Sequence, residues 1–256
     1  MFTDATTSMS SYLSGTDQDR LSRVVNAIDG PFEFYPTYVS VLDSVGHKCG
    51  PESKEMLCAL KELDSDLESF YDAIDQTEHN AVVAFCGDHG MSPVVAYINI
   101  QEAIESLREK SLLRAGVRMF LDSTMARFWF DDEVTDDLNL VISEITARFG
   151  DLGFFVKREQ YTEFGIPDMD MYGSLLWICN DGVVISPDYF NGRDKKVLGM
   201  HGYRPSGSQH YGCIIIAGNN VKNHTQKNPQ PLKTVYAELK KYISTSSTSD
   251  VHVSFK

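Results

Sequence analysis

Short apolar segments alternate with stretches of helical periodicity along this chain, and this alternation limits the fold more than any other feature. Three segments rich in apolar and β-branched residues, at 37–42, 81–86 and 213–217, are typical of strands. Strands of this kind that alternate with helices favour an α/β fold with a mainly parallel sheet flanked by helices. Helical spacing of apolar residues is found at 17–29, 51–74, 101–113, 135–149 and 232–242.

Two further strand pairs are predicted from short apolar runs around turn residues. Residues 118–120 and 126–130 flank Asp122-Ser123, and residues 174–178 and 183–186 flank Asn180-Asp181-Gly182. Turn residues between two apolar runs are typical of a β-hairpin, so we expect each pair to be hydrogen-bonded neighbours.

Three clusters of aspartate and histidine follow or neighbour predicted strand ends. Asp43 and His47 come after the first strand, Asp88 and His89 after the second, and His201 lies in a loop before the third. Ligands of open α/β sheets bind beyond the carboxyl ends of the strands, and carboxylates with neutral imidazoles suit Zn²⁺ and similar ions. Taken singly, each cluster is better explained as a helix cap, a turn or a loop histidine. Their joint occurrence favours a metal centre.

The residues around these clusters resemble a known family. DSVGHKCGPES at 43–53, GDHGM at 87–91 and GMHGY at 199–203 are similar to motifs of the nucleotide pyrophosphatase/phosphodiesterase family of the alkaline phosphatase superfamily. The resemblance implies an alkaline-phosphatase-like α/β catalytic domain over residues 1–243, followed by a Ser/Thr-rich tail at 244–256. It also implies metal-dependent hydrolysis of a phosphodiester or pyrophosphate bond in a small phosphodiester or nucleotide substrate.

The same resemblance implies a site for two metal ions, usually zinc. The residues matching Asp43, His47 and His201 hold one ion, and those matching Asp88 and His89 help to hold the other.

An aromatic residue five positions before the first aspartate lines the substrate pocket of such enzymes, and Tyr38 occupies that place. A half-buried ring on a strand is an equally good interpretation of Tyr38.

The chain departs from the family before its first motif. Relatives carry a first-strand aspartate and a threonine or serine nucleophile well before the position of Asp43, and residues 1–36 offer only Asp4 with Thr6 and Thr7. We therefore expect a fragment that lacks the nucleophile and binds about one metal ion, at Asp43, His47 and His201. The alternatives are a non-catalytic metal-binding pseudoenzyme, another hydrolase of the superfamily such as a sulfatase or phosphonate hydrolase, and a purely structural protein.

Charge and composition exclude several other functions. The 23 basic and 36 acidic side chains give a net charge of −13, which disfavours a nucleic-acid groove or binding to anionic membranes. No apolar run approaches the roughly 20 residues of a membrane-spanning helix. Five cysteines without C-x-x-C spacing predict neither a disulfide framework nor a zinc knuckle. The first residues lack the features of a signal peptide, and the compartment and oligomeric state stay open.

Overall fold

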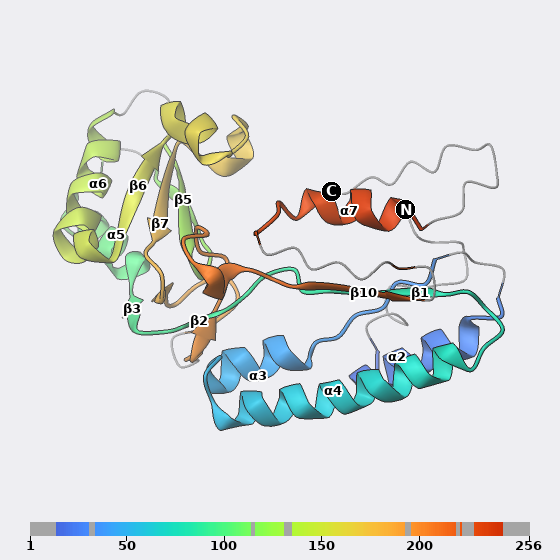
Figure 1. The fold of residues 1–256 in the computed structure, drawn as a ribbon. Coiled ribbons are helices and arrows are strands. Elements are labelled where there is room, and N and C mark those ends of the chain that lie inside the picture. The colour runs from blue at the N-terminus through green and yellow to red at the C-terminus, as the bar shows by residue number, and fades with distance from the viewer. Residues whose placement is uncertain are drawn as a thin grey trace. The chain divides into compact units, whose positions relative to one another are not determined.

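A computed structural model describes residues 14–30, 34–113, 116–130, 135–192, 196–218, 221 and 228–242. The chain divides into two compact units (Figure 1). Unit 1 comprises Met1–Val45, Lys54–Asp88 and Tyr211–Lys256, and unit 2 comprises Gly46–Ser53 and His89–His210. The candidate residues Asp4, Thr6 and Thr7 and the predicted tail at 244–256 lie outside the described residues.

Two amphipathic helices form the core of unit 1. Helix α2 (Asp17–Ala27) lies beside α4 (Lys54–Asp75), as Figure 1 shows, and Leu21 packs against Phe70 and Ile74. Both helices were predicted from apolar spacing, and both are confirmed. The side chain of Thr16 caps α2, because its hydroxyl accepts a hydrogen bond from the Asp19 amide at 3.1 Å.

The strand predicted at 37–42 is wrong. Residues 34–40 have no regular structure, and helix α3 (Val41–Cys49) begins where the strand was expected to end. The Asp17 carboxylate explains the difference, because it accepts hydrogen bonds from the amides of Ser40, at 3.0 Å, and Val41, at 2.9 Å. These amides stand at the start of α3, where no carbonyl within the helix can accept from them. A residue 24 positions earlier thus determines where this helix begins.

Strand β1 (Val82–Cys86) pairs with β10 (Ile214–Gly218) in an antiparallel ribbon. Both strands lie where the sequence predicts them, but they are not buried on both faces. Ile214 is 43% and Ile215 is 55% exposed. The predicted C-terminal helix is also present in unit 1, as α7 (Lys233–Lys240).

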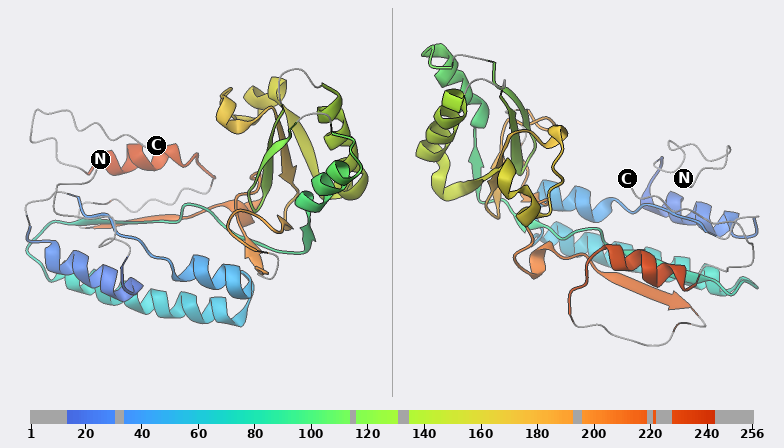
Figure 2. Two further views of the ribbon diagram at one scale, coloured as in Figure 1. Left: turned by 180° about the vertical axis from the view of Figure 1, so that it is seen from behind. Right: turned by 90° about the horizontal axis from the view of Figure 1, so that it is seen from above.

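Unit 2 is built on a four-stranded antiparallel sheet with the order β4-β5-β7-β6. Helices α5 (Ile100–Glu109) and α6 (Thr135–Phe149) cover one face of this sheet (Figures 1 and 2) and bury side chains such as Ile104, Val141 and Ile145. The β4–β5 hairpin and both helices are confirmed predictions. The strands are β4 (Arg118–Leu121), β5 (Met125–Trp129), β6 (Gly153–Lys157) and β7 (Leu175–Cys179).

Two smaller strand pairs complete unit 2. Strand β3 (Ala96–Ile98) runs parallel to β8 (Val183–Ile185), and β2 (Ser92–Pro93) runs antiparallel to β9 (Gly199–Met200). The short 3₁₀ helices are η1 (Gly150–Leu152), η2 (Arg158–Phe164), η3 (Asp170–Tyr172) and η4 (Ser208–His210).

Strand pairing differs from the prediction in two respects. Pairing is mainly antiparallel, and β3–β8 is the parallel pair among the described strands. The predicted hairpin at 174–186 forms its turn, which the Val183 amide closes by donating to the Asn180 carbonyl at 3.1 Å. Its strands nevertheless separate, because β7 pairs with β5 and β6 while β8 pairs with β3. Among the described helices, none is long and apolar enough to cross a membrane.

Candidate metal centre

His47 is fixed by two hydrogen bonds to the segment that leads into β9. Its ring Nδ1 donates to the Gly199 carbonyl at 2.8 Å, and its backbone carbonyl accepts from the Leu198 amide at 2.7 Å. A glycine is required at 199, because a Cβ there would lie 2.5 Å from the Gly46 carbonyl oxygen. The close approach of these two backbones therefore sets the position of the His47 imidazole.

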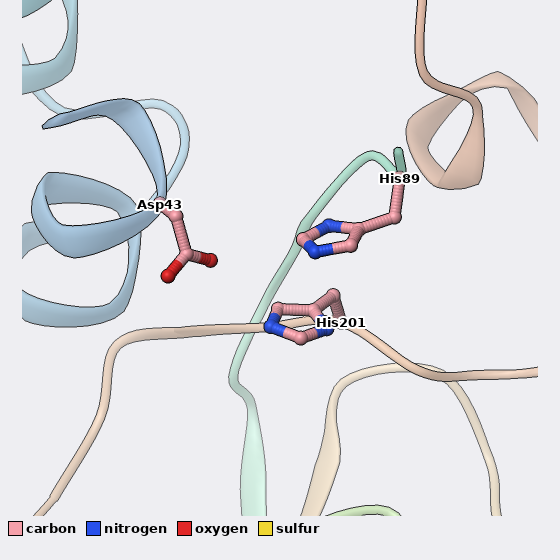
Figure 3. A group of neighbouring side chains, drawn as sticks. All are labelled: Asp43, His89 and His201. Carbon is pink, nitrogen blue, oxygen red and sulfur yellow. The ribbon is translucent and has the colours of Figure 1, made fainter. Parts of the chain in front are cut away.

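His201 directly follows β9 and lies against two other imidazoles of unit 2. Its ring stacks on that of His89, with centroids 3.7 Å apart and an interplanar angle of 17° (Figure 3). The His47 ring lies 5.0 Å from it, tilted by 52°. Three histidines from positions 47, 89 and 201 therefore meet within one unit, as the sequence motifs led us to expect.

His89 is held by the backbone of its own loop. Its Nδ1 donates to the Gly90 carbonyl at 3.0 Å, and the Gly90 amide donates to the carbonyl of His210 at 3.0 Å. A Cβ on residue 90 would lie 2.0 Å from the Gln209 carbonyl oxygen, so only glycine allows this approach. The two chain segments are thereby locked together beside His89.

These hydrogen bonds also determine which ring nitrogen can bind a metal. Nδ1 of His47 and of His89 each donates to a backbone carbonyl, so Nε2 carries the lone pair in the neutral ring. Metal-binding histidines are commonly oriented in this way by a carbonyl on their other nitrogen. The described donor set therefore fits a divalent ion that prefers nitrogen and oxygen ligands.

The candidate carboxylates belong to unit 1, and each lies close to one of the histidines along the chain. Asp43 stands one helical turn before His47 on α3 and is drawn on that helix in Figure 3, and Asp88 directly precedes His89. Residues four apart share one face of a helix. How the five residues divide between two ions is not tested by the structure and stays a prediction.

Tyr38 lies near both carboxylates in unit 1. Burial raises the pKa of its phenol, and the negative charges of Asp43 and Asp88 raise that pKa further. The residue is 42% exposed, and its backbone carbonyl accepts a hydrogen bond from Arg20 Nε at 2.7 Å. Tyr38 therefore lies near Asp43 and Asp88 in the irregular segment before α3, and its part in substrate binding stays a prediction.

A second cluster, which the sequence did not reveal, supports the His89 loop. His210 Nε2 lies 3.0 Å from Asp181 Oδ1 and 3.2 Å from Ser92 Oγ, while the Ser206 amide donates to its Nδ1 at 3.0 Å. Asp181 was predicted only as a turn residue, and a single histidine before an apolar strand gives no signal of such a cluster.

This second cluster is not a nucleophilic triad. Nδ1 of His210 accepts a hydrogen bond, so Nε2 carries the proton and donates to Asp181. Ser92 and Asp181 meet the same ring nitrogen, whereas a relay needs them on opposite nitrogens. The cluster therefore ties the 206–210 segment, the turn at Asp181 and the loop that carries His89 to one another.

Comparison with known proteins adds a family match. The sequence model of the family described as type I phosphodiesterase/nucleotide pyrophosphatase matches residues 2–204. GPI ethanolamine phosphate transferase 2 of Aspergillus fumigatus is 42% identical over 53 residues, which are 20% of this chain and 7% of that protein. The Saccharomyces cerevisiae protein of the same name is 45% identical over 53 residues, which are 20% of this chain and 6% of that protein.

Solved structures are similar over a much larger part of the chain. Human ectonucleotide pyrophosphatase/phosphodiesterase 5 matches 90% of this chain and 59% of its own, with a TM-score of 0.74 and 16% identity. The murine protein matches 80% of this chain and 53% of its own, with a TM-score of 0.64 and 17% identity. The alkaline-phosphatase-like α/β fold predicted from the motifs is thus confirmed. The chain spans little more than half of these structures and less than a tenth of the curated relatives it matches.

Proposed function

Because the chain belongs to the type I phosphodiesterase/nucleotide pyrophosphatase family, we propose that it cleaves a phosphodiester or pyrophosphate bond in a small substrate with the help of bound zinc. The meeting of the His47, His89 and His201 rings in unit 2 carries this proposal. Packing alone does not require three imidazoles from positions so far apart in the chain to lie together, whereas binding of a divalent ion requires such donors.

The ligands of the ion would be the three imidazoles together with the carboxylates linked to them. Asp43 is the natural partner of His47, since one turn of α3 separates them, and Asp88 is the neighbour of His89. Neutral imidazoles and ionised carboxylates are the protonation states that bind a divalent metal.

The chain's own residues would hold and orient the substrate. When bound, a divalent ion stabilises negative charge on the phosphoryl oxygens and lowers the pKa of bound water or hydroxyl. The backbone hydrogen bonds on Nδ1 of His47 and His89 fix the directions of their Nε2 atoms. With a net charge of −13 the whole molecule repels phosphate anions, so attraction must be local to the centre. Tyr38 would pack beside the group next to the scissile bond.

Phosphoethanolamine transfer is the second candidate function. It is favoured by the 42–45% identity to GPI ethanolamine phosphate transferases over 53 residues. Both candidates break a P–O bond in a phosphodiester and differ in the acceptor. Water accepts the phosphoryl group in hydrolysis, and a substrate hydroxyl accepts it in transfer.

Metal content and turnover test the proposal in the same preparations. We expect elemental analysis of the full chain to find bound zinc, and His47→Ala or His201→Ala to lose most of it. His79→Ala is the matched control, because His79 is exposed, lies outside the three motifs and has its ring paired with Asp29 Oδ1 at 2.8 Å. Equal metal content in all four proteins would refute the centre. A stoichiometry near one, lost with Asp43→Asn, would favour the site at Asp43, His47 and His201.

The reaction is assayed with bis(4-nitrophenyl) phosphate and a dinucleotide pyrophosphate in water, and then with an added alcohol acceptor. Faster release of nitrophenol with alcohol, together with an alkyl phosphodiester product, would favour transfer over hydrolysis. Metal binding without turnover of any of these substrates would instead favour the non-catalytic alternative.

A further inference from the structure

A cavity of about 380 Å³ lies within unit 2. Its walls come from the start of β6, the end of β7, the turn that follows β7, and the segment after His201. Its lining includes Phe154, Cys179, Asn180, Asp181, Tyr203 and Arg204. None of His47, His89 and His201 lines it, so its lining is distinct from that of the proposed metal centre.

Arg204 brings a positive charge to the cavity without an anionic partner. It makes neither an ion pair nor a hydrogen bond to any residue that the structure describes. Its guanidinium carbon lies 4.9 Å from the centre of the Phe164 ring. Stacking on an aromatic face holds a guanidinium in place and leaves the N–H donors in its plane available.

Tyr203 is a second residue of this lining that carries a hydrogen-bond donor. The residue is 6% exposed, and its hydroxyl is buried without a hydrogen-bond partner among the described residues. A phenol is protonated at neutral pH and can donate one hydrogen bond. A buried donor without an acceptor costs stability, and a ligand oxygen would remove that cost.

The one carboxylate in the lining does not serve as the partner of Arg204. Asp181 accepts hydrogen bonds from Gln209 Nε2 and His210 Nε2, both at 3.0 Å. Asn180 is also engaged, since its amide donates to the Asp151 carbonyl at 3.0 Å. Arg204 and Tyr203 therefore both bring donors to this lining that have no partner among the described residues.

We infer that this cavity is a binding site for a small phosphate-bearing anion, which Arg204 and Tyr203 hold by hydrogen bonds to its oxygens. A guanidinium with a neighbouring hydroxyl donor suits the several oxygens of a phosphate. The volume exceeds that of one phosphate group, and the Phe154 ring in the wall gives an apolar substituent a surface to pack on. This site is independent of the proposed catalysis.

The test is titration calorimetry of the full chain with inorganic phosphate. We expect saturable binding that Arg204→Gln weakens at least tenfold, because a hydrogen bond to a charged group changes affinity by that order. Tyr203→Phe keeps the ring and removes only the hydroxyl, and we expect a three- to tenfold loss. Arg118→Gln is the matched control, since Arg118 is an exposed arginine of the same unit outside the cavity lining.

A further variant separates this site from the metal centre. His201→Asn should leave phosphate affinity in the cavity within twofold of the parent protein. Phosphate binding that is absent up to millimolar concentration, unchanged in Arg204→Gln and Tyr203→Phe, or lost only in His201→Asn would overturn the inference. A cooperative thermal unfolding transition shows whether each variant is folded. If Arg204→Gln does not fold, the comparison of Tyr203→Phe with the parent protein still tests the inference. A second titration with phenyl phosphate shows which kind of phosphate the cavity binds. Tighter binding than that of inorganic phosphate indicates an organic monoester, and equal binding indicates free phosphate.

Discussion

Replacing Asp17 by alanine should destabilise the protein far more than a change at a helix N-terminus usually does. The Asp17 carboxylate accepts hydrogen bonds from the amides of Ser40 and Val41, and it pairs with Arg20. The side chains of Arg20 and Asp17 are only 6% and 10% exposed. The substitution therefore removes both the cap of α3 and the anion beside a buried guanidinium.

The expected loss can be estimated from these contacts. Removing one partner of a buried ion pair costs about 3–5 kcal/mol, mainly because the other charge stays buried. Loss of a helix cap alone costs about 1 kcal/mol. Arg20 still donates to the Tyr38 and Gly15 carbonyls, each at 2.7 Å, so we expect a total of about 3–5 kcal/mol. That is a large share of the roughly 5–15 kcal/mol by which a typical domain is stable.

Urea unfolding at pH 7 measures this loss, and Asp19→Ala is the matched control. Asp19 lies in the same first turn of α2, but its carboxylate is exposed and accepts from the Thr16 amide at 2.8 Å. A loss in Asp17→Ala no larger than that in Asp19→Ala would refute the reasoning. Asp17→Asn should fall between the parent and Asp17→Ala, because the amide oxygen still accepts from one backbone N–H.

The dependence of the free energy of unfolding on pH in the acid range gives an independent check on Asp17. Burial opposes ionisation of this carboxyl, but hydrogen bonds from Ser40, Val41 and Arg20 outweigh burial and lower its pKa. A lowered pKa stabilises the fold above the carboxyl's unfolded pKa of about 3.9, and that stability is lost as the pH falls through the folded value. The difference between parent and Asp17→Ala should therefore shrink below about pH 4.

Three further outcomes are expected. Gly199→Ala would place a Cβ 2.5 Å from a backbone oxygen, so it should lower the melting temperature and reduce metal content together, and a stable variant with full metal content would contradict this. Burial raises the pKa of the Cys179 thiol to about 12, so iodoacetamide at pH 8 should label the exposed Cys58 and spare Cys179, as peptide mass mapping would show. Burial opposes ionisation of Asp181, but hydrogen bonds from Ser92, Gln209 and His210 outweigh it and lower the pKa, so the stability lost in Asp181→Asn should be full at pH 7 and shrink as the pH falls below about 4; an undiminished loss in acid, measured by urea unfolding, would exclude this.

The helices were predictable because their signal is local. Apolar residues recur every three or four positions in α2, α4, α5 and α6, and tertiary packing uses that face. The error at 37–42 arose because its apolar, β-branched pattern holds no information about Asp17, whose carboxylate starts helix α3 there.

The sequence did not predict which strands pair, nor which residues support the His89 loop. The turn at Asn180-Asp181-Gly182 is encoded locally, but whether β7 and β8 pair depends on strands far away in the chain. Strand β6 was not predicted at all. The three histidines of the candidate centre could be picked out because each lies in a short motif, whereas His210 lies in none and contacts the His89 loop through the Gly90 amide and the Ser92 hydroxyl.

The junction between the end of α3 and β9 has a consequence for sequence variation among relatives. Leu198 contributes only its amide to the hydrogen bond with His47, and its side chain is 51% exposed. The Gly199 carbonyl accepts the hydrogen bond from His47. Because Gly199 has no Cβ, the Gly46 carbonyl can approach it, and any other side chain would block this approach. In a library of all single substitutions, position 198 should accept most residues other than proline, while position 199 should accept almost none. Two adjacent residues of one short segment would thus differ sharply in mutational tolerance, although both serve the same histidine.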